Sequence, residues 1–181
     1  KWRFTYKTVG RGDLIIFDFP GDASEIAPKT PELYVKRVLG LPGETVSVSD
    51  GRAYVNGTAI DYCSAALPSS TDLSKCTFLG PLVIPYKGMT LNLTLATIDK
   101  YSTLIEREGN SVVVENNKII INDKEVDTYT VQDDYYYVLG DNCTDSYDSR
   151  FWGFVPLRNI IGKPIMIYWS VDATSGSIQW D

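Results

Sequence analysis

The apolar positions of this chain fall into short runs, many of them alternating with polar positions, and turn-forming residues separate the runs. Residues 45–49 (Thr-Val-Ser-Val-Ser) show the alternation typical of a strand with one buried face. Asp-Gly, Asn-Gly and Asn-Asn dipeptides, which favour tight turns, follow several runs and indicate antiparallel sheets. We predict strands in the ranges 1–7, 14–19, 34–39, 45–49, 52–55, 80–85, 91–95, 112–115, 118–121, 124–126 and 135–139, and two more within 160–170.

One segment has the spacing of a helix instead. Apolar residues recur there at spacings of three to four positions, at Ile98, Tyr101, Leu104 and Ile105, which predicts a helix over residues 97–108, and Gly109 can end it. The sequence therefore predicts a mostly β fold of antiparallel sheets with at most one or two short helices.

The run at residues 34–39 contains an unusual pair of charges. Lys36 and Arg37 lie side by side among valine and leucine, and neighbours in a strand point to opposite faces. One of the two must therefore point where the core should be. A buried lysine loses its proton more easily, which is how a lysine becomes a general base near neutral pH. The alternative is an edge-strand lysine that discourages aggregation.

A long polar loop follows the apolar run at residues 135–139. It is rich in Gly, Asn, Asp and Ser, and it carries Asp141, Asp145, Asp148 and Arg150 before apolar residues return. Loops held by a rigid sheet are where functional sites are commonly built. The alternative is a solvated turn that caps itself.

Composition excludes several kinds of chemistry. At 181 residues the chain can bury one core, with room for a smaller appended subdomain. Its net charge of −6 argues against a nucleic-acid partner, which would require a basic patch. The chain has no histidine, so Ser-His-Asp and Cys-His catalysis are excluded and the commonest metal ligand is absent. We predict no metal and no cofactor. Any hydrolase here must use a lysine, carboxylates or an external group, which favours a lysine base.

The three cysteines fit no zinc pattern, because the chain has no C-x-x-C motif. Cys63 and Cys76 flank a loop and could form a disulfide worth roughly 3 kcal/mol, which suits an oxidising compartment. Two unpaired thiols are the alternative, and Cys143 is left over in either case. The chain contains no run of 18 apolar residues, so no membrane-spanning helix is predicted within it. It also shows no signal-peptide pattern.

Three segments in order resemble motifs of the type I signal peptidases, membrane-bound proteases that use a serine–lysine dyad. Residues 11–17 match R-G-D-[IVL]-[VI]-x-F, and residues 36–44 match K-R-V-x-G-x-P-G-[DE]. Residues 140–156 match the fixed positions of G-D-N-x-x-x-S-x-D-S-R-x-[WF]-G-x-V-P. Three motifs in the right order are far more specific than any one of them.

The resemblance implies roles for individual residues. Lys36 would be the general base, and Ser146 would orient its amine without adding a charge that raises the pKa again. Tyr34 and Val35 match family positions that line the shallow substrate pockets.

Two charged pairs would support these residues. Asp148 and Arg150 match an ion pair that holds the loop, the alternative being a surface pair worth at most about 1 kcal/mol. Asp141 could pair with Arg37 if the two motifs lie side by side.

The resemblance also implies a division of the chain. We expect a catalytic core from residues 1–42 plus 133–181, and an inserted β-rich subdomain from residues 43–132. The aromatic face of residues 1–7 could then belong to the core or approach the membrane.

The family's nucleophilic serine belongs to an S-M-x-P-T motif upstream of these segments, and the chain contains no Ser-Met dipeptide. We therefore expect a truncated form without the nucleophile and the membrane anchor, inactive by itself. The full protein would remove signal peptides from exported pre-proteins after small residues, A-x-A-like, on the outer face of the bacterial inner membrane.

Two other interpretations compete with this one. The first is a catalytically silent relative that binds extended peptides as a chaperone or assembly factor. The second is a self-cleaving repressor with the same dyad chemistry. The complete last motif and the absence of a basic DNA-binding segment argue against the repressor.

Overall fold

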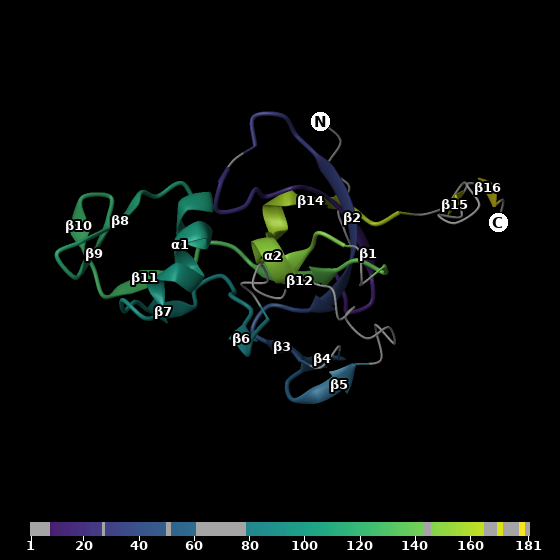
Figure 1. The fold of residues 1–181 in the computed structure, drawn as a ribbon, viewed down its shortest axis with the longest axis horizontal. Coiled ribbons are helices and arrows are strands. Elements are labelled where there is room, and N and C mark those ends of the chain that lie inside the picture. The colour runs from purple at the N-terminus through teal and green to yellow at the C-terminus, as the bar shows by residue number, and fades with distance from the viewer. Residues whose placement is uncertain are drawn as a thin grey trace.

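The computed structural model of the chain describes residues 8–26, 28–49, 52–60, 79–142, 146–164, 170–171 and 178–179. Within these ranges the chain forms five sheets, all with antiparallel pairings, and two α-helices (Figure 1). The predicted mostly β fold class is therefore confirmed.

The largest sheet brings the two most informative segments of the sequence together. Its strand order is β13-β12-β2-β1-β14, and each neighbouring pair is antiparallel. The strands are β1 (Leu14–Asp18), β2 (Leu33–Gly40), β12 (Tyr135–Leu139), β13 (Val155–Pro156) and β14 (Ile160–Gly162). Because β2 and β12 are neighbours, the lysine-containing strand and the polar loop after β12 meet at the centre of this sheet.

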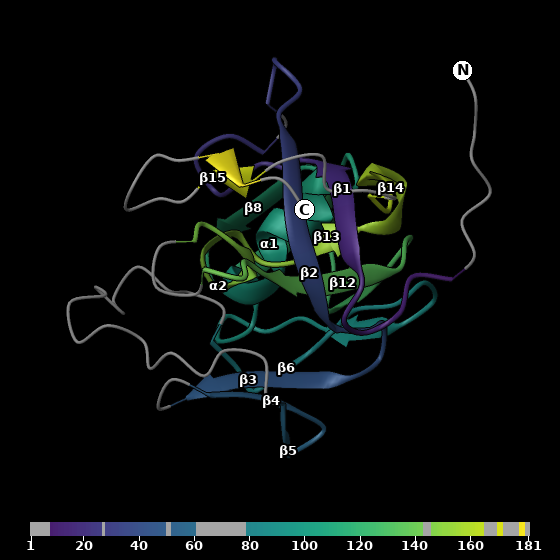
Figure 2. The same cartoon turned by 90° about the vertical axis from the view of Figure 1, so that its right-hand side faces the viewer.

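The segment between β2 and β12 forms three smaller sheets. One has the order β5-β4-β3-β6, with β3 (Thr45–Ser49), β4 (Arg52–Val55), β5 (Thr58–Ile60) and β6 (Leu82–Val83). Another pairs β7 (Thr90–Asn92) with β11 (Thr128–Thr130), and a third contains β8 (Val112–Glu115), β9 (Lys118–Ile121) and β10 (Lys124–Glu125). The β3–β6 sheet lies below the central sheet in Figure 2. The predicted strands at 80–85 and 91–95 thus belong to different sheets.

The predicted helix at residues 97–108 is confirmed as α1 (Ile98–Arg107). Its buried face includes Ile98, Leu104 and Ile105, as the spacing predicted. Gly109 ends it, with a φ of 87° that glycine adopts without strain and an N–H that bonds the carbonyl of Glu106 at 2.8 Å.

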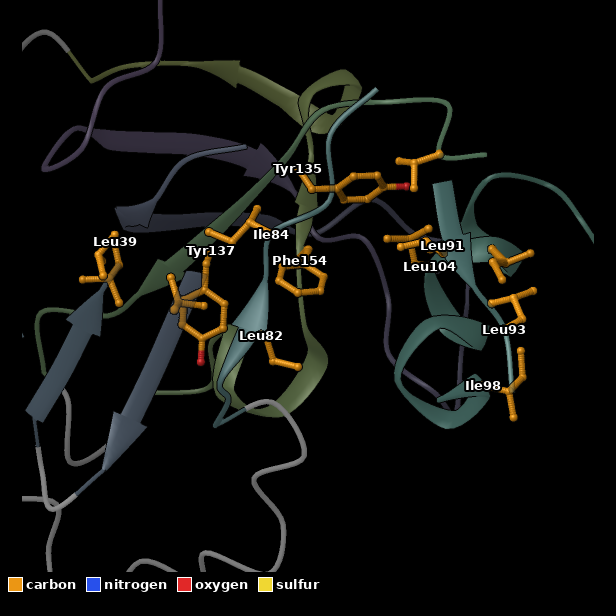
Figure 3. Close-up of a cluster of buried hydrophobic side chains, with 14 of the residues drawn as sticks. Leu39, Leu82, Ile84, Leu91, Leu93, Ile98, Leu104, Tyr135, Tyr137 and Phe154 are labelled. Carbon is orange, nitrogen blue, oxygen red and sulfur yellow. The ribbon is translucent and has the colours of Figure 1, made fainter. Parts of the chain in front are cut away.

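Strand β12 lies between two apolar clusters, which explains why all five of its residues are buried. Tyr135, Tyr137 and Leu139 face the cluster that includes residues of β3, β6 and α1 (Figure 3). Tyr136 and Val138 face the other cluster, with β1 and the segment after the polar loop. Side chains alternate across a strand, so a strand buried on both faces shows no polar alternation in its sequence.

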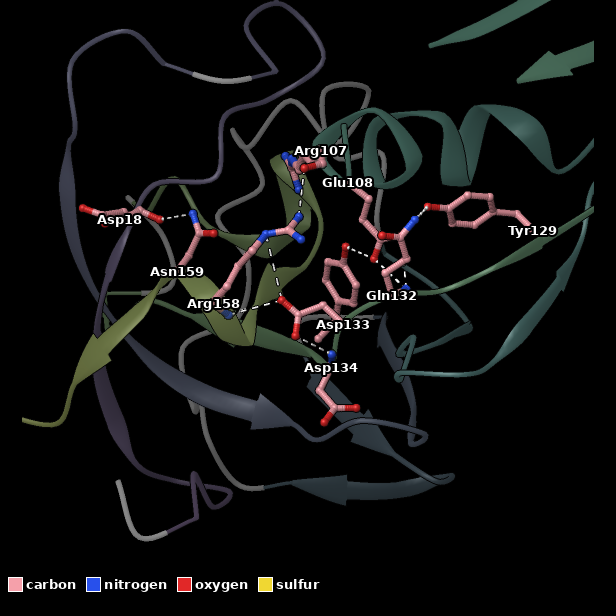
Figure 4. Close-up of polar contacts among 10 residues, drawn as sticks. Asp18, Arg107, Glu108, Tyr129, Gln132, Asp133, Asp134, Arg158 and Asn159 are labelled. Atoms are coloured by element: carbon pink, nitrogen blue, oxygen red, sulfur yellow. Dashed lines mark hydrogen bonds and ion pairs between the residues drawn. The ribbon is translucent and has the colours of Figure 1, made fainter. Parts of the chain in front are cut away.

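Glu108, just after α1, ties this helix to two strands (Figure 4). Its carboxylate accepts hydrogen bonds from the hydroxyls of Tyr129 in β11 at 2.5 Å and Tyr135 in β12 at 2.8 Å. The backbone N–H of Gln132 adds a third bond at 3.0 Å. One carboxylate therefore satisfies three donors from the chain that leads from β11 into β12.

We retain the division into a core of residues 1–42 plus 133–181 and an insertion of residues 43–132 as a proposal. The strand order supports it, because every strand of the central sheet comes from the flanking parts of the chain. The apolar cluster on one face of β12 nevertheless spans both parts, so the insertion packs against the core rather than hanging free of it.

Some predictions concern residues outside the described ranges. These are the strand at residues 1–7, the second of the two strands within 160–170, the disulfide between Cys63 and Cys76, and the free thiol of Cys143. All of them stay predictions. The last described strands, β15 (Ser170–Val171) and β16 (Ile178–Gln179), pair with each other.

Candidate active site

Lys36 lies in β2, one residue past the end of its ladder with β12. The β12–β2 ladder ends with Leu139 opposite Arg37, and Lys36 is the next residue of β2. On the other side, β2 stays paired with β1, where Lys36 lies opposite Ile15. The lysine is therefore held by a strand that is paired with β1, and its side chain reaches the loop that follows β12.

The face of β2 that carries Lys36 joins the apolar cluster around β1. Tyr34, Lys36 and Val38 alternate along this face, and Val38 is fully buried in the cluster that also contains Ile15 and Phe17. Lys36 itself is half-buried. Of the two adjacent cations, Lys36 is therefore the one on the face of β2 that joins this apolar cluster.

Burial lowers the pKa of Lys36, because desolvation penalises the charged amine. The negative charges of Asp148 and Asp141 act in the opposite direction, and the positive charge of Arg150 acts with burial. The net direction is downward, toward the neutral amine that a base requires.

Ser146 lies next to this amine. Lys36 Nζ donates a hydrogen bond to Ser146 Oγ at 2.9 Å, across a separation of 110 residues. The bond is partly buried, and the hydroxyl brings no charge of its own. The structure therefore brings together the two residues to which the sequence motifs assign the general base and the hydroxyl that orients it.

Asp148 and Arg150 hold the loop that carries Ser146. Asp148 Oδ1 accepts from Arg150 Nε at 2.8 Å, and Oδ2 accepts from Arg150 Nη2 at 2.9 Å. The side chains are 0% and 3% exposed, so this is a buried pair and not the surface pair considered from the sequence. Asp148 also caps the short helix α2 (Ser149–Trp152) and accepts from the backbone N–H of Gly140 at 3.1 Å. The pair thus fixes both ends of the loop.

Two further residues of the loop matter, and sequence analysis assigned them no role. A Cβ built on Gly140 would clash with Ser146, 2.6 Å from its Cβ, and would lie 3.3 Å from Lys36 Nζ. Ser149 Oγ accepts a hydrogen bond from the backbone N–H of Val138 in β12 at 2.9 Å. Both positions are fixed in the last motif, but only the folded geometry gives the reason.

Arg37 and Asp141 form the second predicted pair. Arg37 Nε and Nη2 bond the two carboxylate oxygens of Asp141 at 2.9 and 2.6 Å. The two side chains are 30% and 56% exposed, so the pair contributes little stability by itself. Its effect on the site is to place a positive charge beside one of the two carboxylates that act on Lys36.

Tyr34 and Val35, predicted together as pocket residues, point to opposite faces of β2. The ring of Tyr34 stacks on Phe19 with centroids 4.8 Å apart, and Lys36 Nζ is 5.8 Å from its centroid. The side chain of Val35 is 52% exposed on the other face. Strand alternation therefore removes the Val35 side chain from the space around the amine.

The backbone of Val35, in contrast, faces the open side of β2. Val38 donates its N–H to the carbonyl of Asp13 on the β1 side at 2.9 Å. Backbone polar groups alternate between the two sides of a strand, so those of Arg37 and Val35 face the β12 side. Arg37 pairs there with Leu139, whereas no described strand pairs with Val35 on that side.

Other candidate features are absent from the described ranges. No group of three or more Cys, Asp or Glu side chains in them could hold a metal ion. No described helix is long and apolar enough to cross a membrane. Asp145 and the three cysteines lie outside these ranges.

Comparison with known proteins places this geometry in a family. The family model described as "Signal peptidase, peptidase S26" matches residues 1–169. The probable signal peptidase I-2 of Synechocystis sp. is 29% identical over 161 residues, covering 89% of this chain and 49% of that protein. Signal peptidase I of Rickettsia bellii is 30% identical over 184 residues, covering 100% of this chain and 53% of that protein.

A solved signal peptidase I from Enterococcus faecalis V583 is 24% identical, with a TM-score of 0.41, and the match covers 88% of this chain and 99% of that one. The chain spans about half the length of the curated relatives it matches. Because the family model covers nearly the whole chain, the chain belongs to the signal peptidase family S26.

Proposed function

We propose that this chain carries the general base of a type I signal peptidase, and that the whole protein removes signal peptides from exported pre-proteins by serine–lysine chemistry. The observation that carries the proposal is the hydrogen bond between Lys36 Nζ and Ser146 Oγ, just past the end of the β12–β2 ladder. Membership of the signal peptidase family supports the activity.

The chemistry needs a neutral lysine amine. A serine that attacks an amide must lose its proton to a base, which then protonates the leaving amine. A neutral amine has two N–H donors and one lone pair. If one N–H is bonded to Ser146 Oγ, the lone pair is directed elsewhere and can accept the proton of a nucleophile.

The charges around Lys36 are arranged so that desolvation decides its pKa. Asp148 and Asp141 would each favour the ammonium form. Each is bonded through both carboxylate oxygens to an arginine, Asp148 to Arg150 and Asp141 to Arg37. The positive charge of Arg150 opposes the negative charge of Asp148 at the amine, and the burial of Lys36 is the largest effect.

The nucleophile is expected on a segment bearing the family's Ser-Met motif, which these 181 residues do not contain. We place the site on the outer face of the bacterial inner membrane, with signal peptides as substrates, by family membership. A catalytically silent peptide-binding protein remains the alternative, but peptide binding alone would not require a lysine with a lowered pKa.

The substrate would bind as an extended strand along the open side of β2. An added strand is held by main-chain hydrogen bonds, and alternate side chains enter pockets. The backbone of Val35 faces this side, and the ring of Tyr34 lies beside the amine. Cleavage after small residues is consistent with limited room near an aromatic ring that is stacked on Phe19.

The first prediction concerns the general base and the hydroxyl that orients it. In a protein that carries both this chain and the nucleophile segment, Lys36→Ala should lower kcat at least about a hundredfold, because the base acts in the transition state. Ser146→Ala should cost less, because the hydroxyl only orients the amine. Cleavage of a pre-protein followed by electrophoresis measures both, and near-normal turnover of Lys36→Ala would refute the assignment.

The second prediction is a pH profile. Only neutral Lys36 can accept a proton, so kcat/KM should rise with pH through the pKa of Lys36, and the midpoint should lie below the value of 10.5 of an unperturbed lysine. The same titration should appear in this chain alone by NMR of ¹³C-dimethylated lysines, assigned with Lys36→Arg. A Lys36 pKa of 10.5 or higher in the folded chain would contradict the proposed base.

The third prediction tests the close packing at Gly140. In Gly140→Ala the new methyl group would displace Ser146 from Lys36, so kcat should fall about a hundredfold, as expected for a misplaced catalytic contact. The matched control is Gly10→Ala, where the added Cβ meets only Asp13 Oδ2 at 3.4 Å. Equal activities of the two variants, at equal thermal stability, would show that the Lys36–Ser146 contact is dispensable.

The fourth prediction separates the backbone of Val35 from its side chain. Val35→Pro removes an N–H that faces the open side of β2, where proline is tolerated, and KM should rise about tenfold for loss of one main-chain bond to substrate. Val35→Thr keeps the N–H and alters a side chain on the far face, so its KM should stay near the wild-type value. Kinetics on a signal-peptide substrate measure both. A larger rise of KM in Val35→Thr than in Val35→Pro would show that the substrate contacts the side chain of Val35 and not its backbone.

A further inference from the structure

The turn after β1 contains a carboxylate that reaches the Ser146 loop. Asp22 Oδ1 accepts three local hydrogen bonds, from Ser24 N at 2.8 Å, Ser24 Oγ at 2.5 Å and Glu25 N at 3.2 Å. Its other oxygen, Oδ2, accepts from the hydroxyl of Tyr147 at 2.7 Å, across 125 residues. The local bonds fix the carboxylate, so Tyr147 is tied to a rigid point of the chain outside its own loop.

The ring of Tyr147 is held as well as its hydroxyl. It packs against Phe19 with centroids 6.0 Å apart and against Phe151 at 5.5 Å. Phe19 in turn stacks on Tyr34, two residues before Lys36. A continuous row of rings therefore links the residue after Ser146 to the strand that carries the lysine.

Other described contacts hold Ser146 less firmly. Its carbonyl accepts from Arg150 Nη2 at 3.4 Å, a long hydrogen bond, and its side chain is bonded to Lys36, the group to be positioned. Tyr147 stands at a variable position of the last motif, so the motif does not account for its contact with Asp22.

We propose that Asp22 and Tyr147 form a clasp that sets the position of the Ser146 hydroxyl against Lys36, which makes both of them positioning residues. This inference rests on the proposed function of the Lys36–Ser146 pair. The clasp acts through Ser146, because Tyr147 follows it directly in the chain and neither clasp residue has a described hydrogen bond to Lys36.

The clasp does not titrate near neutral pH. Hydrogen bonds from Ser24 and then Tyr147 lower the pKa of Asp22 to about 2. Burial, with the bond to Asp22, raises the pKa of the Tyr147 phenol above its ordinary value. The acceptor therefore stays ionised and the donor stays protonated around neutral pH, and a change in the pH profile of a clasp variant there reports on another group.

That group is Lys36. The charged groups acting on its amine are Asp148, Arg150 and Asp141, and the ring of Tyr34 lies beside it. None of them is changed when the clasp is broken. A displaced Ser146 would instead admit water to the amine and relieve its desolvation, so the pKa of Lys36 should rise toward that of free lysine.

The test compares two variants that each delete one tyrosine–carboxylate hydrogen bond. Tyr147→Phe removes the clasp and keeps the ring, whereas Tyr129→Phe removes the bond to Glu108 in the inserted part of the chain. We expect Tyr147→Phe to raise the pKa of Lys36 by about half a unit to one unit, the equivalent of one hydrogen bond. Tyr129→Phe should leave it unchanged, by NMR titration of ¹³C-dimethylated lysines.

Activity provides a second measurement in a protein that carries the nucleophile segment. Tyr147→Phe should lower kcat about tenfold, change KM less than about twofold and move the pH midpoint upward with the Lys36 titration. Tyr129→Phe should change neither constant, and thermal unfolding establishes that both variants are folded.

The outcomes separate this inference from the function on which it rests. A pKa of 10.5 or higher for Lys36 in the unmodified chain would overturn the proposed general base. A lowered pKa that is the same in the unmodified chain and in Tyr147→Phe would overturn the clasp and leave the base intact. Equal shifts in Tyr147→Phe and Tyr129→Phe would show a general loosening of the fold and would also overturn the clasp.

Discussion

The proposed role of Lys36 as a base depends on a lowered pKa of its amine, although two carboxylates act on that amine in the opposite direction. An isolated aspartate beside a half-buried lysine would stabilise the ammonium ion and abolish the base. In this chain each of the two carboxylates is bonded to an arginine through two nitrogens. The Asp148–Arg150 pair is buried, and the Asp141–Arg37 pair is exposed. The buried pair therefore shapes the loop, and its arginine acts with desolvation, the largest influence on the pKa of Lys36.

The loop can deliver Ser146 to the amine only because β12 ends where it does. The five residues of β12 are buried on both faces, so its position relative to β2 cannot slip without exposing one of the two apolar clusters. The chain then turns at Gly140, where the lack of a side chain allows Ser146 and Lys36 to approach. The inserted sheets contribute by packing against Tyr135 and Tyr137, and none of their residues in the described ranges has a described hydrogen bond to Lys36 or Ser146.

Sequence patterns predicted those parts of the structure that depend on local regularity. Alternation and spacing located β2, β12 and α1 within one or two residues, and the adjacent Lys36 and Arg37 revealed a cation directed toward the core. Helix α2 was missed, because it has only four residues and its capping by Asp148 outweighs its weak periodicity. Sequence resemblance grouped Tyr34 with Val35 as pocket residues, and only strand alternation in the folded sheet separates their side chains. The contact between Asp22 and Tyr147 has no local pattern at all, since a hydrogen bond across 125 residues depends on the assembled fold.

Holding Lys36 in this place has a consequence for the stability of the fold. A lysine whose pKa is lower in the folded chain than in the unfolded chain binds fewer protons when folded, so stability increases with pH between the two values. Below the folded-state pKa the protein carries the full cost of a charged amine over an apolar cluster. Nothing in the packing of β2 requires a lysine there, since an apolar residue would pair with Ile15 and pack beside Val38 without that cost. The residue is therefore better explained by the chemistry of its amine than by the stability of the strand. The burial of β12 on both faces stabilises the fold and offsets the cost of this lysine.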